Sequence, residues 1–231
     1  MIKDKKGFAL EALLRTTIAV VLAYIAIFHI GKPAAEAAFG SNDASQSFDR
    51  FVNEINSLQE GPGKQSLVAL DEGTAVIGFS KNTKEFKCHV CQTVYGQAYS
   101  ELYYYSINKP SNPECSDKAC ACLCVKGLTI DQSSGTERKI NCGQFSCRTL
   151  NKDIDIVAKI SLEDALKKRG VSIATFPYWE NGFFFVRRKN PSTPLNGMPP
   201  NDARDITLFI EKKRLNQELY VGVCPSLPCI Q

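Results

Sequence analysis

Residues 119–125 have the sequence ACACLCV, in which three of the chain's ten cysteines occupy alternate positions. An alternation of period two, with Ala, Leu and Val between the cysteines, is typical of a β-strand that is buried on both faces. Cysteines two residues apart in a strand have Cα atoms about 6.6–6.8 Å apart, which is the upper limit for a disulfide between them. We therefore expect each of the three cysteines to bond to a different segment of the chain.

The cysteines as a set favour a disulfide-bonded scaffold. All ten follow the apolar N-terminal segment and their number is even, as in domains that fold in an oxidising compartment. Cys142 and Cys147 are near enough in sequence to close a local loop, and so are Cys224 and Cys229; the remaining pairing stays open. The expected disulfide cysteines are Cys88, Cys91, Cys115, Cys120, Cys122, Cys124, Cys142, Cys147, Cys224 and Cys229.

Two other chemistries use the same cysteines. Cys88 and Cys91 have the C-x-x-C spacing of a zinc site, which Cys142 and Cys147 would complete. Thiolates along an extended strand stand too far apart for one tetrahedral ion, so we expect no metal. A redox-active pair at Cys88 and Cys91 is the other alternative, although the Tyr-rich residues after Cys91 make a poor helix for lowering a thiol pKa.

Residues 8–31 predict a membrane-spanning helix. The apolar run is interrupted by Glu11 and Arg15, which lie four residues apart on one helix face and are expected to pair. At about 1.5 Å of rise per residue the run is long enough for a hydrocarbon core of about 30 Å. Basic residues in the leader 1–7 place the N-terminus in the cytoplasm, so the rest of the chain is expected outside.

The same segment has two alternative interpretations. Ala35-Glu36-Ala37 fits a small-residue cleavage site, which would make the segment a removable signal peptide. Residues 5–14, KKGFALEALL, resemble the leader of type IV pilins: basic residues, Gly7, Phe8 and a Glu inside an apolar helix. That resemblance implies a mature protein that begins at Phe8 and helices that assemble with each other, Glu11 neutralising a neighbour's amino terminus. An uncleaved single-pass anchor is our main expectation.

The remaining chain predicts one amphipathic helix and several strands. Apolar residues recur at helical spacing from Phe48 to Leu58, with Ser47 as the N-cap and Gly61-Pro62-Gly63 as the end. Strands are expected at 66–70, 74–79, 101–107, 119–125 and 153–160, and a short helix at 161–168.

Two hairpins complete the expected elements. Asn181-Gly182, between strands at 175–179 and 183–187, is a favoured two-residue hairpin turn. A second hairpin pairs 206–212 with 219–223. The expected fold is α+β: a linker at 32–46, then a disulfide-rich, mainly antiparallel β domain over 47–231 with one or two short helices.

Composition excludes several function classes. Lys and Arg number 28 against 24 Asp and Glu, and a net charge of +4 is too weak to indicate a nucleic-acid partner. Only His29 and His89 are present, so neither a Ser-His-Asp site nor a multi-histidine metal site is expected. The chain has no P-loop or dinucleotide fingerprint, and we expect no cofactor and identify no small-molecule substrate. Aromatic clusters at 103–105 and 176–185 predict mainly core packing.

A final resemblance concerns the whole arrangement. The basic leader, the single span, the amphipathic helix and a domain with Pro110, Cys115 and the 119–124 pattern resemble uncharacterised single-pass envelope proteins of small-genome archaea. That resemblance implies a surface location and no known chemistry. We therefore expect a membrane-anchored cell-surface protein in a structural or interaction role, in contact with membrane lipid and an envelope or self-assembly partner. The alternatives are a pilin-like subunit and an extracytoplasmic thiol–disulfide oxidoreductase that uses Cys88 and Cys91.

Overall fold

In the computed structural model, the residues described are 43–89, 104–134, 137–163, 167, 178–187 and 205–230. Residues 44–231 form one compact unit. The expected membrane helix at 8–31, with Glu11 and Arg15, lies outside the described residues. Within the described residues, no helix combines the length and the apolar character needed to cross a bilayer.

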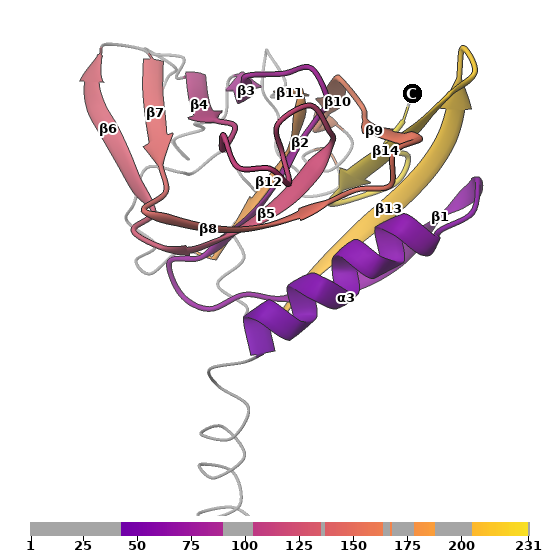
Figure 1. Cartoon of the computed structure of the whole chain (residues 1–231), viewed down its shortest axis with the longest axis horizontal. Helices are drawn as coiled ribbons and strands as arrows, with labels where there is room; N and C mark the ends of the chain where they lie inside the picture. Colours follow the sequence, from indigo (N-terminus) through magenta and orange to yellow (C-terminus); the bar gives the residue numbers. More distant parts are fainter. Residues whose placement is uncertain are drawn as a thin grey trace, which may run out of the picture. The chain divides into compact units, whose positions relative to one another are not determined.

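The described elements are one helix followed by strands of 3 to 11 residues (Figure 1), which confirms the expectation of a mainly antiparallel β domain with a helix. They are α3 (Asp43–Ser57), β1 (Gly61–Ala69), β2 (Ala75–Phe79), β3 (Glu85–His89), β4 (Tyr104–Asn108), β5 (Cys120–Lys126), β6 (Thr129–Ser134), β7 (Glu137–Asn141), β8 (Gln144–Thr149), β9 (Ile154–Ile156), β10 (Lys159–Ser161), β11 (Tyr178–Glu180), β12 (Gly182–Val186), β13 (Asp205–Leu215) and β14 (Glu218–Cys224).

The strands form three sheets. One has the order β1-β13-β14-β9, a second the order β10-β11-β3-β4-β7-β6, and a third the order β12-β2-β5-β8. Among the described pairs, β14 with β9 and β4 with β7 are parallel, and the others are antiparallel. Consecutive strands are often in different sheets, so the chain passes repeatedly between layers.

Helix α3 packs its apolar face on the domain, as its helical spacing predicts, and lies along β1 and β13 (Figure 1). Phe51 and Ile55 are buried on this face. The helix begins at Asp43, so the expected N-cap at Ser47 is wrong. Ser47 lies inside the helix, where its buried hydroxyl oxygen accepts a hydrogen bond of 2.8 Å from the N–H of Ala69 in β1. The hydroxyl fixes the helix to the sheet edge instead of capping the helix.

The turn at Asn181-Gly182 does not join a hairpin, so that expectation is wrong. Strand β11 before the turn pairs with β10 and β3, whereas β12 after it pairs with β2 in another sheet. Asn181 nevertheless has the positive φ, 64°, that this dipeptide favours. A Cβ atom on Gly182 would lie 1.9 Å from the carbonyl oxygen of Gly78, so only glycine permits the close approach of β12 to β2. The turn carries the chain from one sheet to the next.

The second expected hairpin is confirmed. Strands β13 and β14 pair antiparallel around Asn216 and Gln217, whose φ values of 49° and 72° suit a tight hairpin turn. The single strand expected at 153–160 is instead two short strands, β9 and β10, which belong to different sheets. The short helix expected at 161–168 lies largely outside the described residues.

Strand β12 connects the layers through its aromatic side chains. Phe183 contacts Phe51 of α3 edge to face, with ring centroids 6.1 Å apart. Phe184 stacks on Phe86 of β3, with centroids 5.9 Å apart. Trp179 is fully buried between these layers and the rest of the core. Trp179 and the three phenylalanines of β12 are therefore core residues, as expected, whereas Tyr178 is only partly buried.

Candidate functional site

Strand β5 positions three cysteines on one face, and each is bonded to a different segment, as its alternating pattern predicts. The central position of β5 between β2 and β8 buries every residue from Cys120 to Cys124. The disulfides are Cys115–Cys120 to the preceding loop, Cys122–Cys147 to β8, and Cys124–Cys142 to the connection before β8.

The local disulfide considered between Cys142 and Cys147 is wrong. Cys147 lies directly opposite Cys122 in the β5–β8 ladder, so its sulfur points at the neighbouring strand. Cys142 lies before β8, where the chain passes the end of β5, and it bonds to Cys124. Strand pairing, rather than distance along the sequence, selects these partners.

The local disulfide expected between Cys224 and Cys229 is present, with Cα atoms 5.4 Å apart. The loop that it closes is held against β13 by Glu211. One carboxylate oxygen of Glu211 accepts hydrogen bonds from the N–H groups of Cys229 (2.8 Å) and Ile230 (3.0 Å). The bridge and the carboxylate together order the end of the described chain.

Cys88 lies near the end of β3, is fully buried and is disulfide-bonded. Cys91 lies outside the described residues. Every cysteine that the structure describes takes part in a disulfide. A catalytic thiol must be accessible to its substrate, so the complete burial of Cys88 does not favour exchange chemistry at this position.

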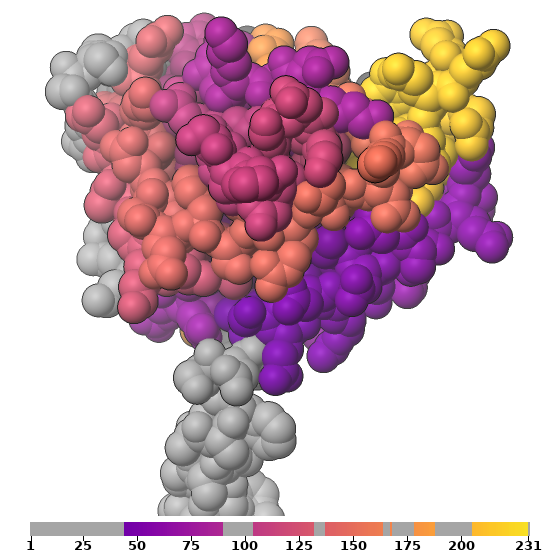
Figure 2. All heavy atoms as spheres, viewed as in Figure 1, coloured from indigo at the N-terminus to yellow at the C-terminus, as the bar shows by residue number. Residues whose placement is uncertain are grey.

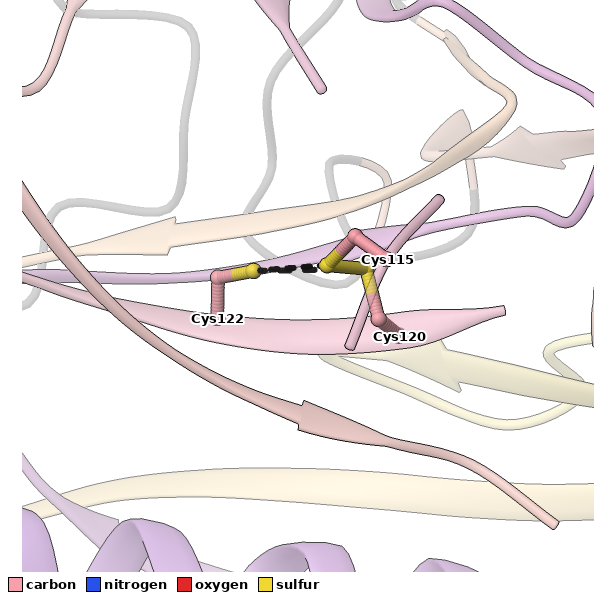
Figure 3. Close-up of side chains that lie close together, drawn as sticks. All are labelled: Cys115, Cys120 and Cys122. Atoms are coloured by element: carbon pink, nitrogen blue, oxygen red, sulfur yellow. Dashed lines mark hydrogen bonds between the residues drawn. A yellow bond between two sulfur atoms is a disulfide. The ribbon is translucent and has the colours of Figure 1, made fainter. Parts of the chain in front are cut away.

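Three buried sulfur atoms around the start of β5 lie within 4.8 Å of one another, and a fourth is bonded to one of them; we call the four the sulfur cluster: Cys115, Cys120, Cys122 and Cys147. The Sγ of Cys122 lies 3.5 Å from the Sγ of Cys115 and 4.0 Å from that of Cys120 (Figure 3). Each of these three side chains is completely buried. Our expectation that thiolates along a strand stand too far apart for one ion is therefore wrong for Cys120 and Cys122, because their side chains converge above the strand.

The Cys115–Cys120 and Cys122–Cys147 disulfides lie side by side. Exchange requires the attacking sulfur to approach along the extension of the bond that breaks, and its distances to the two bonded sulfurs then differ by a full bond length, about 2 Å. The distances from Cys122 to Cys115 and Cys120, 3.5 and 4.0 Å, differ far less. The sulfur of Cys122 thus packs against the flank of the Cys115–Cys120 bond, and the oxidised structure does not prearrange an exchange between them.

A second group of polar and aromatic side chains lies on the six-stranded sheet. His89 stacks on Tyr178 with ring centroids 4.4 Å apart and 9° between the planes, and its Nε2 lies 3.0 Å from a carboxylate oxygen of Glu180. The ammonium group of Lys159 lies 4.1 Å from the centre of the Tyr178 ring. Because His89 occupies one face of that ring, Lys159 lies over the opposite face. Both faces of Tyr178 are therefore covered, and of the described aromatic clusters only Tyr104 remains exposed.

A polar pocket of about 400 Å³ opens beside the turn that follows β2. Asp155 lines this pocket, and its carboxylate accepts hydrogen bonds from the N–H groups of Lys81 (2.8 Å) and Ile156 (2.7 Å). The carboxylate therefore connects the turn after β2 to β9. Nearby, the ammonium of Lys109 donates to the carbonyls of Ser80 (2.7 Å) and Lys81 (2.7 Å). Burial lowers the pKa of Lys109 below its usual value, although Asp155 and Asp117 oppose the shift.

Comparison with other proteins finds no relative. No family model matches the chain, and no curated protein or solved structure is significantly similar to it. Its function is therefore inferred from its own residues, among which the cysteines of β5 and their partners are the most distinctive.

Proposed function

We propose that this is a single-pass membrane protein whose disulfide-bonded domain lies outside the cytoplasm and has a structural or interaction role. The observation that carries the proposal is the oxidation of all described cysteines, three of them from one buried strand. Disulfides persist in oxidising compartments, whereas cytosolic thiols are kept reduced. The apolar segment at 8–31 supplies the means of anchoring and export.

The disulfides suit a domain that must stay folded outside the cell, where chaperones do not refold it. The bridges of Cys122 and Cys124 join positions 25 and 18 residues apart, so they restrict long loops of the unfolded chain. Such bridges lower the population of open states that extracellular proteases attack. A long-lived surface domain is the role that this construction supports.

An interaction role has a physical basis on the outer side of α3, which Figure 2 shows uncovered on this face of the domain. The helix is tied to the strand region by an ion pair of 2.9 Å between Asp49 and Arg148, and by a hydrogen bond of 2.9 Å from the N–H of Asn151 to Asn56. A shallow hollow of about 750 Å³ is lined by polar side chains of α3 and by Asn151. A polar, rigidly held surface of this kind suits reversible contact with another hydrophilic envelope component.

Topology is the first test. Alkaline phosphatase, which needs an oxidising compartment, is fused after Gln231 of the full chain, and a green fluorescent protein fusion provides the opposite report. We expect phosphatase activity with the full chain and none when residues 1–31 are deleted. Fluorescence without phosphatase activity would place the domain in the cytoplasm and overturn the proposal.

Thiol counting is the second test. The full chain is denatured under non-reducing conditions and treated with N-ethylmaleimide, with and without prior reduction. We expect no modification before reduction and modification of all ten cysteines after it. Several reactive thiols in the untreated protein would contradict an oxidised scaffold.

A pilin-like filament subunit is the second candidate, favoured by the leader sequence at 5–14. N-terminal sequencing of the mature protein separates the two candidates. A mature protein that begins at Phe8 supports the pilin-like function, and an intact N-terminus supports the permanent anchor.

A further inference from the structure

The sulfur cluster gathers four cysteines from three separate segments. Cys120 and Cys122 come from β5, Cys115 from the preceding loop and Cys147 from β8. The sulfur atoms of Cys115, Cys120 and Cys122 all lie within 4.8 Å of one another. The fourth sulfur, that of Cys147, is bonded to Cys122. Once the two disulfides are reduced, such a buried group of sulfur atoms can act as metal ligands.

We infer that the reduced chain binds one zinc ion at the sulfur cluster, so that these four sulfurs exist either as two disulfides or as one zinc tetrathiolate. Zinc–sulfur bonds of about 2.3 Å in a tetrahedron place neighbouring sulfurs about 3.8 Å apart. The distances from the sulfur of Cys122 to those of Cys115 and Cys120, 3.5 and 4.0 Å, bracket that value. The sulfur of Cys147 is outside the group that lies within 4.8 Å and must turn towards it. Reduction leaves the two bonded pairs free to separate to the same spacing.

The backbone holds the four ligands in place for this geometry. Cys147 faces Cys122 across the β5–β8 ladder with Cα atoms 4.0 Å apart, and Cys115 lies 5.3 Å from Cys120 by the same measure. After reduction, rotation of the four side chains about their Cα–Cβ bonds turns the sulfurs towards one ion. Cys124, the third cysteine of β5, bonds to Cys142 and belongs to neither pair.

Charge and solvation favour a metal over free thiolates. Cys115, Cys120 and Cys122 are fully buried and Cys147 is 5% exposed, so thiolates there would be costly without a cation. A divalent ion offsets half of the charge of four thiolates, and thiolate is a ligand that zinc binds strongly. Binding releases the four thiol protons to solvent, so the affinity rises with pH.

The two states interconvert by thiol–disulfide exchange with a low-molecular-weight disulfide. Two molecules of that disulfide accept four electrons and leave as four thiolates. The four zinc-bound thiolates become the disulfides Cys115–Cys120 and Cys122–Cys147, and one Zn²⁺ is released. Until that oxidation, zinc keeps these four cysteines from pairing with the other six.

The experiment uses the full chain in detergent, denatured and reduced, then refolded without oxygen in the presence of zinc chloride. After removal of unbound zinc, a colorimetric chelator measures the zinc that remains. We expect one zinc ion per reduced chain and none on the oxidised protein. Absence of retained zinc on the reduced chain would overturn the inference.

Thiol footprinting identifies the ligands without any substitution. The zinc-loaded chain is treated briefly with N-ethylmaleimide, and mass spectrometry locates the modified residues. We expect protection of the sulfur cluster, reversed by a chelator, and faster modification of Cys142, which is only partly buried. Protection of Cys88 and Cys91 instead of the cluster would overturn the assignment.

Paired variants complete the design. The double variant Cys120→Ser with Cys122→Ser is expected to lose the bound zinc. The matched control, Cys224→Ser with Cys229→Ser, replaces two buried cysteines outside the cluster and is expected to retain the zinc. Equal zinc on both variants contradicts the inference. The topology fusions fail or succeed independently of this result, because they report the side of the membrane and not the ligands of an ion.

Discussion

Cys122 and Cys147 lie directly opposite each other in the β5–β8 ladder, with Cα atoms 4.0 Å apart and their sulfur atoms bonded. This bridge joins the buried strand β5 to the edge strand β8 across 25 residues of sequence. It therefore fixes the pairing of β5 and β8, and with it the position of the sulfur cluster in the core.

Removal of this bridge is expected to destabilise the domain strongly. The double variant Cys122→Ala with Cys147→Ala should lower the free energy of unfolding by about 3.5 kcal/mol, because the unfolded chain regains the freedom of a 25-residue loop. Chemical denaturation without reductant measures the difference. The control, Cys224→Ala with Cys229→Ala, opens a five-residue loop and should lose only about 2 kcal/mol. An equal or larger loss in the control contradicts this account.

Glu211 is expected to hold the C-terminal loop in place. Glu211→Ala leaves the N–H groups of Cys229 and Ile230 without their acceptor in a buried setting, which should cost about 1–3 kcal/mol. Glu211→Gln keeps one acceptor oxygen and should cost less. Hydrogen exchange at residues 229 and 230 locates the effect, and unchanged exchange at these two amides in Glu211→Ala would refute it.

Lys212 gives the stability a dependence on pH. It continues the buried row of Ile206, Leu208 and Ile210 on β13, and burial lowers its pKa below the usual 10.5 despite the attraction of Asp153 and Glu60. Between the two pKa values the unfolded chain binds more protons than the folded chain, so stability from this residue rises with pH.

The variant Lys212→Met tests that dependence. At neutral pH it should be more stable than the wild type, because it buries no charge. The difference should shrink as the pH rises towards 10.5, where the wild-type lysine loses its proton in both states. Denaturation curves at several pH values measure it, and a gap that is constant or widens over this range would count against the explanation.

Gly182 is expected to tolerate no side chain. Gly182→Ala places a Cβ atom 1.9 Å from the carbonyl oxygen of Gly78, so β12 must move away from β2, at a cost of about 3 kcal/mol. The control Gly73→Ala meets no atom within 4 Å and bears only the strain of its positive φ, about 1–2 kcal/mol. Thermal unfolding ranks the two variants, and the reverse order would be inconsistent with the packing.

Several elements follow from local patterns in the chain. The alternation at 119–125 predicts the buried strand β5 and its three separate disulfide partners. The 3.6-residue spacing predicts the buried face of α3, although not its start at Asp43. These predictions succeed because the side-chain period of a helix or strand is a property of the backbone itself.

Other expectations fail where the outcome depends on contacts between distant segments. Asn181 has the backbone conformation of a hairpin turn, yet β11 and β12 enter different sheets because β3 and β2 are their partners. Likewise, Cys142 and Cys147 are five residues apart, and each bonds to β5 instead of to the other. The number of residues between two positions does not predict their distance once strands pair.

Local patterns in the sequence were enough to predict a cysteine-bearing buried strand, an amphipathic helix, the β13–β14 hairpin and a local bridge in the loop that follows it. Which sulfurs meet depends on the packing of strands and loops, which gathers Cys115, Cys120, Cys122 and Cys147 in the core. The reason is physical: periodicity is encoded residue by residue along the backbone, whereas the meeting of side chains depends on how sheets and loops pack through space.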